Sequence, residues 1–275
     1  MRLTVLVDNN TYTDSYFYGE PALCFYIEEN NRKILFDTGY SDIFIKNAEK
    51  MGIDLTQIDS LVLSHGHNDH TWGLEFLLKI LKDKSSKVSS PELISHPSTF
   101  IPKRHKEYED IGLKFSQDSL SEYFNLNLST TPLWITEKLV FLGEIKRCND
   151  YENKTPCGQI LLNGLQDDYL MEDSALVYKS PKGLVIITGC SHSGICNIIE
   201  QAIETCNDDR IYCVIGGFHL LNPSDKILSE TLNFMKMINP QNLYACHCVD
   251  LNTKIELSKI AAIKEVGVGL TLTFE

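Results

Sequence analysis

The segment LSHGHNDHTWGL, residues 63–74, places three histidines and an aspartate within six residues, in a chain that has only eight histidines. Imidazole and carboxylate groups are the standard protein ligands of zinc, iron and manganese. His65 and His67 lie two residues apart and can point the same way from an extended segment, whereas Asp69 and His70 fall at the start of a helix. A fixed H-x-H-x-D-H spacing is far more specific than a lone histidine. It predicts a metal site, and its two parts suit two adjacent metal ions better than one.

The elements around this cluster are predicted from the apolar pattern. Residues 61–63 (LVL) look like the end of a short buried strand, and residues 71–81 (TWGLEFLLKIL) have the apolar spacing of a helix. The cluster then lies on a strand-to-helix loop, and such loops face outward from a rigid scaffold. We therefore expect the four side chains to lie outside the hydrophobic core.

The same order of elements occurs twice along the chain. Residues 23–39 (LCFYIEENNRKILFDTG) contain two strand-like runs around an Asn-Asn turn, and residues 174–190 (SALVYKSPKGLVIITGC) contain two such runs around Ser-Pro-Lys-Gly. Each hairpin is followed by a helical stretch and then by a strand that ends near a histidine. These stretches are residues 42–51 and 60–63 in the first half, and residues 194–206 and 212–215 in the second.

Strands that alternate with helices in two similar halves predict an α/β architecture, a four-layer αββα sandwich with two sheets face to face and helices outside. We expect residues 1–275 to form a single domain of this kind, with a site where loops of both halves meet. His192, His219 and His247 each follow a strand-like run of the second half. Together they are better explained as a converging set than as three separate structural histidines.

Between the halves, residues 83–168 follow a less regular pattern that is rich in Ser, Thr, Asn and Lys. This pattern indicates an insertion of loops and short elements. On an acidic chain, a basic run within it either binds a phosphate group or forms a solvated face. The candidate substrate contacts of the insertion are His96, Lys103 and Arg104 of the basic run Lys103-Arg104-His105-Lys106, and Arg147.

The formal net charge of -12 argues against nucleic acid or an anionic membrane as the main partner, because those partners need clustered Lys and Arg. The N-terminal run MRLTVLVDNN is too short for a signal peptide, and no stretch approaches the ~18 apolar residues of a membrane helix. These observations predict a cytoplasmic protein that is directed at a small, anionic molecule. They leave its oligomeric state open.

The nine cysteines are odd in number and show no C-x-x-C pair, so neither a disulfide framework nor a zinc ribbon is indicated. We expect most of them to be small buried hydrophobes. Three lie near histidines: Cys190 in TGCSHSGI, and Cys246 and Cys248 in ACHCVD. A thiolate from one of these could bind a metal ion, whereas the spacing of an iron–sulfur cluster is absent.

Together, VLVDNN, ILFDTG, SHGHNDH, FLGEIKR, TGCSHSGICN, GGFHL and ACHC resemble the motifs of the metallo-β-lactamase fold superfamily over nearly the whole chain. Within this superfamily, the chain looks most like the group of dihydropterin ribofuranosylaminobenzene-phosphate synthase-like proteins. The resemblance implies metal ligands from both halves, and an acidic residue that orients ligand histidines through their other ring nitrogen. The implied roles are His65, His67 and His192 for one metal ion, Asp69, His70 and His247 for a second, and Asp37 for the orienting acid.

One departure from the superfamily pattern bears on the substrate. Many members have an aspartate in the second half that bridges the metals, but the corresponding segment here reads VIGGFHL and has no carboxylate. With neutral histidines and Asp69 as the one anionic ligand, two divalent ions carry a formal charge of about +3. We expect such a site to prefer an anionic ligand, such as a phosphate ester.

The leading hypothesis is a metal-dependent hydrolase with two divalent ions, which activate a shared water. Zinc is the first choice of metal, with iron and manganese as alternatives, and Asp69 orients the water or carries its proton. One alternative is a synthase-like transferase that joins a pterin-type unit to a ribosylated aminobenzene phosphate. Another is a non-hydrolytic iron protein of redox or sensory function, since histidine and carboxylate do not distinguish zinc from iron. The transferase would need an aromatic pocket, for which the candidates are Tyr12, Tyr16, Phe17 and Tyr18.

Overlaying the two halves places LVLSHGH against CVIGGFH, so that His219 corresponds to His67 and Gly217 to His65. A neutral imidazole donates one lone pair and cannot bridge two metals as a carboxylate can. His219 is therefore expected to bind a single metal ion or to form a hydrogen bond with the substrate.

Overall fold

The computed structural model describes residues 1–83, 90–105 and 110–275, so that Lys106 of the basic run lies outside the described residues. The chain forms two compact units. Unit 1 contains Met1–Ser129, Gly158–Asp167 and Gly267–Phe274, and unit 2 contains Thr130–Cys157 and Asp168–Val266 together with Glu275. The stretch expected as an insertion at 83–168 is thus divided between the two units, and each unit is described by itself.

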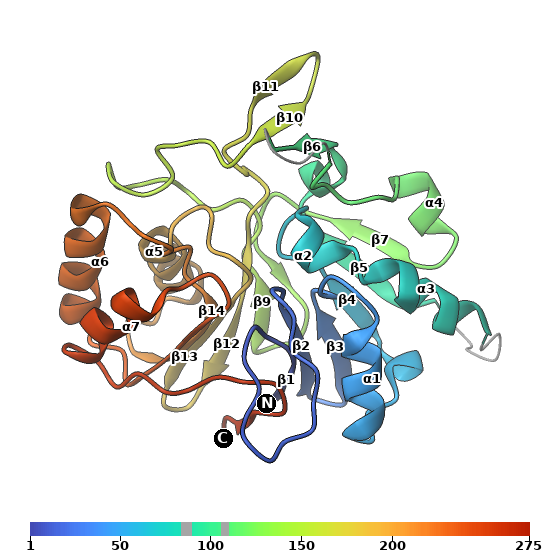
Figure 1. Ribbon diagram of the computed structural model, residues 1–275, viewed down its shortest axis with the longest axis horizontal. Coiled ribbons are helices and arrows are strands. Elements are labelled where there is room, and N and C mark those ends of the chain that lie inside the picture. Colours follow the sequence, from blue (N-terminus) through green and yellow to red (C-terminus); the bar gives the residue numbers. More distant parts are fainter. Residues whose placement is uncertain (84–89, 106–109) are drawn as a thin grey trace. The chain divides into compact units, whose positions relative to one another are not determined.

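Unit 1 is built on a seven-stranded sheet with the order β16-β1-β2-β3-β4-β5-β7 (Figure 1). The strands from β16 to β3 are antiparallel to their neighbours, and those from β3 to β7 run parallel. The predicted first hairpin is β2–β3, and its turn residues Asn30 and Asn31 have positive φ values of 49° and 63°, which asparagine tolerates better than most residues. The strands are β1 (Arg2–Val7), β2 (Cys24–Glu29), β3 (Arg32–Phe36), β4 (Ser60–Val62), β5 (Glu92–Ser95), β7 (Asn125–Leu128) and β16 (Thr271–Thr273).

Helices pack against one face of this sheet (Figure 1). Phe44 of α1 and Leu77 of α3 are fully buried in one apolar cluster with Leu35 and Leu61 of the strands. The helices of unit 1 are α1 (Ile43–Lys50), α2 (Asn68–Thr71), α3 (Leu74–Asp83) and α4 (Gln117–Ser121), with short 3-10 helices η1 (Leu55–Gln57) and η2 (Pro97–Phe100).

The helix predicted over residues 71–81 is in fact two helices, α2 and α3, which are separated at Trp72 and Gly73. A Cβ atom on Gly73 would lie 2.0 Å from the carbonyl oxygen of Thr38. Glycine therefore allows the chain after β3 to approach the helical segment closely, and the close approach interrupts the helix.

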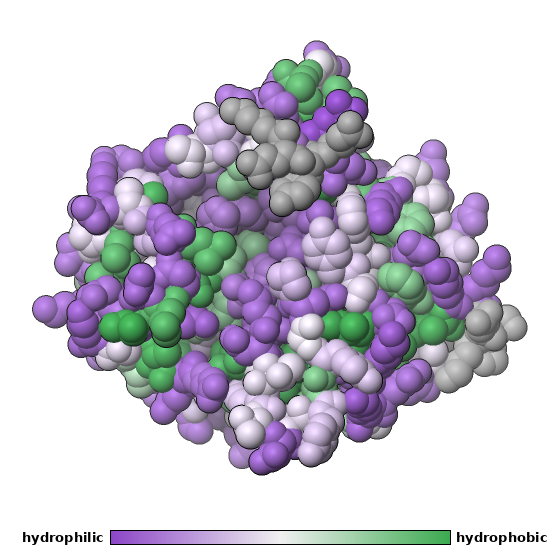
Figure 2. Space-filling model, in the orientation of Figure 1, coloured by the Kyte–Doolittle hydropathy of each residue, from purple (hydrophilic) through white to green (hydrophobic). Residues whose placement is uncertain are grey.

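A small three-stranded sheet, with the order β11-β10-β6, also belongs to unit 1. Its strands are β6 (Lys103–Arg104), β10 (Gln159–Leu161) and β11 (Leu165–Asp167). The hairpin β10–β11 exposes Leu161, Leu162 and Leu165. Figure 2 shows hydrophobic atoms at the position of this hairpin, whereas much of the rest of the visible surface is hydrophilic.

Unit 2 is built on a six-stranded sheet with the order β15-β14-β13-β12-β9-β8. Ile198 and Ile199 of α5 are buried in one apolar cluster with Val177 and Ile186 of the strands. The strands are β8 (Leu133–Trp134), β9 (Leu139–Phe141), β12 (Ala175–Ser180), β13 (Gly183–Thr188), β14 (Ile211–Gly217) and β15 (Asn242–Cys246), and the helices are α5 (Ile195–Cys206), α6 (Asp225–Ile238) and α7 (Leu251–Ser258).

The predicted repeat is confirmed at the level of sheet topology. In unit 1, the antiparallel hairpin β2–β3 continues through α1 into the parallel strand β4. In unit 2, the antiparallel hairpin β12–β13 continues through α5 into the parallel strand β14. Both units therefore place a loop at the end of a parallel strand that follows a helix.

Within the described ranges, no helix is both long enough and apolar enough to span a bilayer.

Helix α5 receives its N-terminal cap from a distant residue. Its N-cap position is Gly194, with φ 100°, which has no capping side chain. Glu152 accepts hydrogen bonds from the backbone N–H groups of Cys196 and Asn197 at 2.9 and 3.0 Å, and from Asn149 Nδ2 at 2.8 Å. Two of the donors that a helix start leaves unsatisfied are thus satisfied by a buried carboxylate.

We expect Glu152→Ala to lower the free energy of unfolding by about 1–3 kcal/mol, because it removes a cap and leaves buried donors without acceptors. Denaturant unfolding measures this change. The control is Glu204→Ala on the same helix, whose side chain is 64% exposed and pairs with Lys146; it should cost under ~1 kcal/mol. Equal effects of the two substitutions would contradict the capping role.

Candidate metal centre

The first group of predicted metal ligands lies at the end of β4 in unit 1. A short loop connects this buried strand to α2, whose N-cap residue is His67. His65 and His67 lie on the loop, and Asp69 and His70 lie in α2, as the sequence predicted. Ligand atoms of His65, His67 and Asp69 all lie within 4.8 Å of one another, and Nε2 of His70 is 3.6 Å from Oδ2 of Asp69. The structure thus brings all four side chains together.

Asp37, which follows β3, forms hydrogen bonds with this loop and with α2. Its fully buried carboxylate accepts hydrogen bonds from the backbone N–H of Ser64 at 2.8 Å, from Ser64 Oγ at 2.7 Å and from His70 Nδ1 at 2.7 Å. The backbone of Asp37 has φ 59°, a left-handed conformation that aspartate adopts more readily than most residues. This geometry fits the orienting role expected of Asp37.

The same hydrogen bonds decide which ring nitrogens can face a metal ion. A carboxylate accepts only, so Nδ1 of His70 is the donor and its lone pair lies on Nε2. The Ser64 hydroxyl donates to Asp37 and lies 2.9 Å from Nδ1 of His65, so it accepts the hydrogen bond of that ring nitrogen. His65 and His70 therefore both present Nε2 as the metal-binding atom. Ser64 was not predicted as a site residue, although it directly precedes His65 in the motif.

The expectation that the loop lies outside the core is wrong. His65 and His70 are 0% exposed, and His67 is 9% exposed. The loop is drawn inward because Asp37 and Ser64 are themselves buried and bonded to it. Additional backbone bonds support the same junction, such as that from Thr38 N–H to the carbonyl of His70 at 2.8 Å.

The second group of predicted ligands lies in unit 2, where β13, β14 and β15 are parallel neighbours. His192, His219 and His247 follow these three strands in order, and the rings of His192 and His219 are 4.2 Å apart between centroids. Nε2 of His247 lies 3.2 Å from Sγ of Cys190. The predicted convergence of loops is thus observed within this unit.

A cysteine that the sequence did not single out joins this group. Sγ of Cys157 lies 3.4 Å from Nδ1 of His192 and 3.6 Å from Nε2 of His219. Of the cysteines singled out, Cys190 and Cys248 lie beside these histidines, since the N–H of His219 donates to Cys248 Sγ at 3.2 Å and Cys248 Sγ donates to the carbonyl of Cys190 at 3.4 Å. Cys246 is buried at the end of β15. Nothing in the motif TPCG marks Cys157 as a partner of histidines.

The sulfur atoms shift the titration of their neighbours in the metal-free chain. His219 is exposed, yet partial desolvation of its ring lowers its pKa. Hydrogen bonds with Cys157 and Cys248 outweigh this effect and raise the pKa to about 10. Burial raises the pKa of Cys248, but the neighbouring Cys190, His219 and His247 bring it well below its usual value.

The candidate substrate contacts of the irregular stretch are placed differently from one another. Lys103 is 1% exposed whereas Arg104 is exposed, so the two do not form one basic surface. His96 is buried and caps η2, with Nδ1 accepting from the N–H of Ser98 at 3.1 Å. Arg147 donates to the carbonyls of Ile145 and Leu170 and to Asn153 Oδ1. These bonds favour a structural role for His96 and Arg147 over contact with a substrate.

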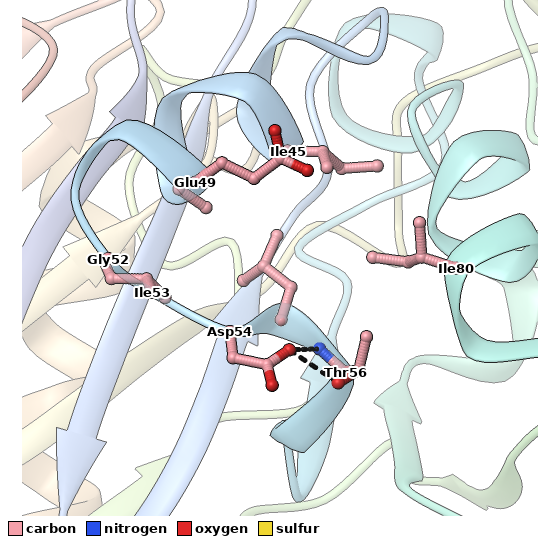
Figure 3. A pocket seen from close by; sticks show the side chains of 9 residues that line it. Ile45, Glu49, Gly52, Ile53, Asp54, Thr56 and Ile80 are labelled. Atoms are coloured by element: carbon pink, nitrogen blue, oxygen red, sulfur yellow. Dashed lines mark hydrogen bonds between the residues drawn. The ribbon is translucent and has the colours of Figure 1, made fainter. Parts of the chain in front are cut away.

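A separate pocket of about 450 Å³ opens between α1, η1 and α3 of unit 1 (Figure 3). Ile45 and Ile80 point towards each other across it, and Asp54 accepts hydrogen bonds from the backbone N–H and the hydroxyl of Thr56 at 3.0 and 2.5 Å. The residues that line it include none of the predicted metal ligands. It therefore lies apart from the candidate centre.

Comparisons with known proteins agree with the motifs. The model of the metallo-beta-lactamase superfamily matches residues 18–137. The chain is 29% identical over 262 residues, covering 90% of this chain and 87% of the relative, to 7,8-dihydropterin-6-methyl-4-(beta-D-ribofuranosyl)-aminobenzene-5'-phosphate synthase of Methanocaldococcus jannaschii. It is also 31% identical over 104 residues, 37% of this chain and 42% of the relative, to a UPF0173 metal-dependent hydrolase of Staphylococcus aureus.

Among solved structures, the chain is similar to Tm1679, which is described as a metal-dependent hydrolase of the beta-lactamase superfamily. The TM-score is 0.84 with 28% sequence identity, and the match covers 100% of this chain and 99% of that one. The arrangement of strands and helices therefore agrees over the full length.

Proposed function

We propose that the chain hydrolyses a small anionic substrate, first of all a phosphate ester, with metal-activated water. The metallo-beta-lactamase superfamily model matches residues 18–137, and the chain is similar over its full length to Tm1679, a metal-dependent hydrolase of the beta-lactamase superfamily. The observation that carries this proposal is the group of His65, His67, Asp69 and His70 in unit 1. The donor atoms of His65, His67 and Asp69 lie within 4.8 Å of one another, and Nε2 of His70 lies 3.6 Å from Oδ2 of Asp69. Imidazole and carboxylate donors of this kind fit zinc, iron or manganese, with zinc as our first choice.

The residues at the site have different roles: some would bind the ion, Asp37 and Ser64 orient ligand rings, and Asp69 transfers a proton. A divalent ion held by these donors would lower the pKa of a water molecule and polarise the group under attack. Asp37 and Ser64 hold the rings of His70 and His65 so that Nε2 faces the ion. The side chain of Asp69 is 23% exposed while that of His70 is fully buried. Asp69 is thus the member of the group that can exchange a proton with solvent, and we assign it the proton of the attacking water.

An anionic substrate is supported by the ligand inventory. VIGGFHL, the segment that ends β14, contains no carboxylate, so Asp69 is the one acid among the predicted ligands. The synthase of Methanocaldococcus jannaschii, which this chain resembles, carries a phosphate in the name of its product. Both observations favour a phosphorylated substrate over a neutral one.

The experiment is a screen of phosphomonoesters, phosphodiesters, lactones and thioesters with chain of defined metal content. We expect turnover in the phosphoester classes, loss of turnover on chelation, and recovery on adding back zinc. Hydrolysis by the metal-free chain at the full rate would contradict the proposal.

Inorganic phosphate should inhibit this turnover competitively at millimolar concentration, since it offers the same oxygen atoms as the ester group. Initial rates at several phosphate concentrations measure the effect, with sulfate and chloride at equal ionic strength as controls. Equal inhibition by all three salts would indicate screening by salt instead of binding.

A second candidate is a synthase-like transfer reaction, favoured by 29% identity to that enzyme over 90% of the chain. Of the tyrosines proposed for an aromatic pocket, Tyr16 is 83% exposed and Tyr18 is 48% exposed. The Nζ atom of Lys50 lies 4.2 Å from the ring centre of Tyr18, and a Cβ on Gly269 would lie 2.6 Å from the Phe17 ring. Incubation with a pterin and a ribosylated aminobenzene phosphate, followed by mass spectrometry, tests for the joined product.

A visible spectrum of anaerobically purified chain tests the iron alternative, because a colourless two-zinc protein excludes a redox centre.

A further inference from the structure

We propose that Cys157, His192 and His219 form a metal site within unit 2, in which Cys157 is a thiolate ligand. The inference deepens the proposed function and rests on it, because it requires that the chain binds a metal ion. It assigns a sulfur ligand that neither the H-x-H-x-D-H motif nor the histidines of the second half would supply. It also gives His219 the single-metal role expected from the internal repeat.

The three donor atoms have the spacing of a tetrahedral site. A metal–sulfur bond of about 2.3 Å and a metal–nitrogen bond of about 2.0–2.1 Å, at a tetrahedral angle, put the two donors about 3.5 Å apart. Sγ of Cys157 lies 3.4 Å from Nδ1 of His192 and 3.6 Å from Nε2 of His219. Ligand atoms of all three residues lie within 4.8 Å of one another. An ion can therefore enter without a large movement of these side chains.

Hydrogen bonds hold the backbone of each donor in place. His219 has a left-handed conformation, φ 52°, and its N–H donates to Cys248 Sγ at 3.2 Å. The carbonyl of His192 accepts from Asn153 Nδ2 at 2.9 Å, and the N–H of Cys157 donates to the carbonyl of Asp168 at 2.9 Å. Because the donors are positioned before any ion arrives, binding would cost little ordering.

The charge of the site supports a thiolate ligand. Unit 2 brings His192 and His219 together, but both are neutral ligands when they bind a metal. VIGGFHL, the segment that ends in His219 and Leu220, contains no acidic residue. A thiolate on Cys157 adds the missing negative charge, and thiolate favours zinc, iron or cobalt over manganese and magnesium.

The test uses the full chain, purified without oxygen, stripped with a chelator and loaded with cobalt(II). Thiolate ligation gives cobalt an intense sulfur-to-metal charge-transfer band in the near ultraviolet. We expect this band in the wild-type chain and in Cys148→Ser, whose cysteine is free and exposed, and we expect its loss in Cys157→Ser. Persistence of the band in Cys157→Ser would overturn the inference, and a band lost in Cys190→Ser instead would assign the sulfur to Cys190.

A second measurement needs no substitution, so it does not depend on the folding of a variant. Alkylation of the wild-type chain by iodoacetamide, followed by peptide mass spectrometry, should be at least 10-fold slower at Cys157 when zinc is present, and unchanged at Cys148. Zinc that binds in equilibrium dialysis but leaves Cys157 equally reactive would overturn this inference alone. Failure of the chain to take up zinc or cobalt at all would overturn the proposed function as well.

Discussion

Replacement of His67 by alanine should lower the affinity for zinc and the rate of hydrolysis by more than ~100-fold, because loss of a residue that merely orients a ligand already costs about 10–100-fold. The fold should persist. His67 is buried, but it is the N-cap residue of α2 without a capping side-chain hydrogen bond, and its ring lies beside the ring of His65, so its loss removes no helix cap and leaves no large apolar cavity. Metal content by mass spectrometry, steady-state rates and circular dichroism measure the three effects.

The matched control is His105→Ala, which removes an exposed histidine that is not among the predicted metal ligands. It should leave metal content and rate unchanged. The role of His67 as a ligand would be contradicted if His67→Ala retained stoichiometric zinc, or if both variants lost activity to the same extent.

The second large effect is expected at Asp37. Asp37→Ala leaves the N–H and hydroxyl of Ser64 and Nδ1 of His70 without their acceptor inside the protein, and alanine fits a φ of 59° poorly. The free energy of unfolding should fall by roughly 3 kcal/mol or more. Denaturant unfolding measures it. The control is Asp42→Asn, at a residue whose side chain is 38% exposed and pairs with Lys46, with an expected change under ~1 kcal/mol.

Asp37→Asn separates orientation from stability. Asparagine keeps the size of the side chain and tolerates the left-handed backbone, but its amide group would donate to Nδ1 of His70 where the carboxylate accepts. The ring proton would then move to Nε2, the atom expected to bind the metal. We expect the zinc dissociation constant, measured by competition with a chelator, to rise about 10–100-fold with a smaller loss of stability. Unchanged affinity would show that Asp37 only supports the fold.

The sequence predicted the repeated hairpins and the position of the histidine cluster because both follow from local patterns. The turn at Asn30 and Asn31 and the spacing in LSHGHNDH are set by neighbours in the chain. The burial of His65 was not predictable in this way, since it depends on a hydrogen bond between Asp37 and Ser64, 27 residues apart.

Cys157 shows the same limit more strongly. It lies 35 residues before His192 and 62 residues before His219 along the chain, in a stretch without periodic apolar residues. The rings of the two histidines come together only because the strands that precede them pair, and the local spacing of residues does not predict that pairing. The break of the predicted helix at Gly73 has a similar origin, because the carbonyl of Thr38 lies far from it in sequence.

The pairing of β1 with β16 has a consequence for biosynthesis. Arg2 lies opposite Thr273, and the N-terminal amine donates to the carbonyl of Phe274 at 3.0 Å. During translation, β1 leaves the ribosome early, but its neighbour on this side is made only after Thr130–Cys157 and Asp168–Val266 of unit 2. Until then, one edge of the sheet stays open, and an open strand edge can pair with another nascent chain. A chain that stops before Thr271 would keep that edge permanently, so premature termination should yield aggregates in place of a smaller folded protein.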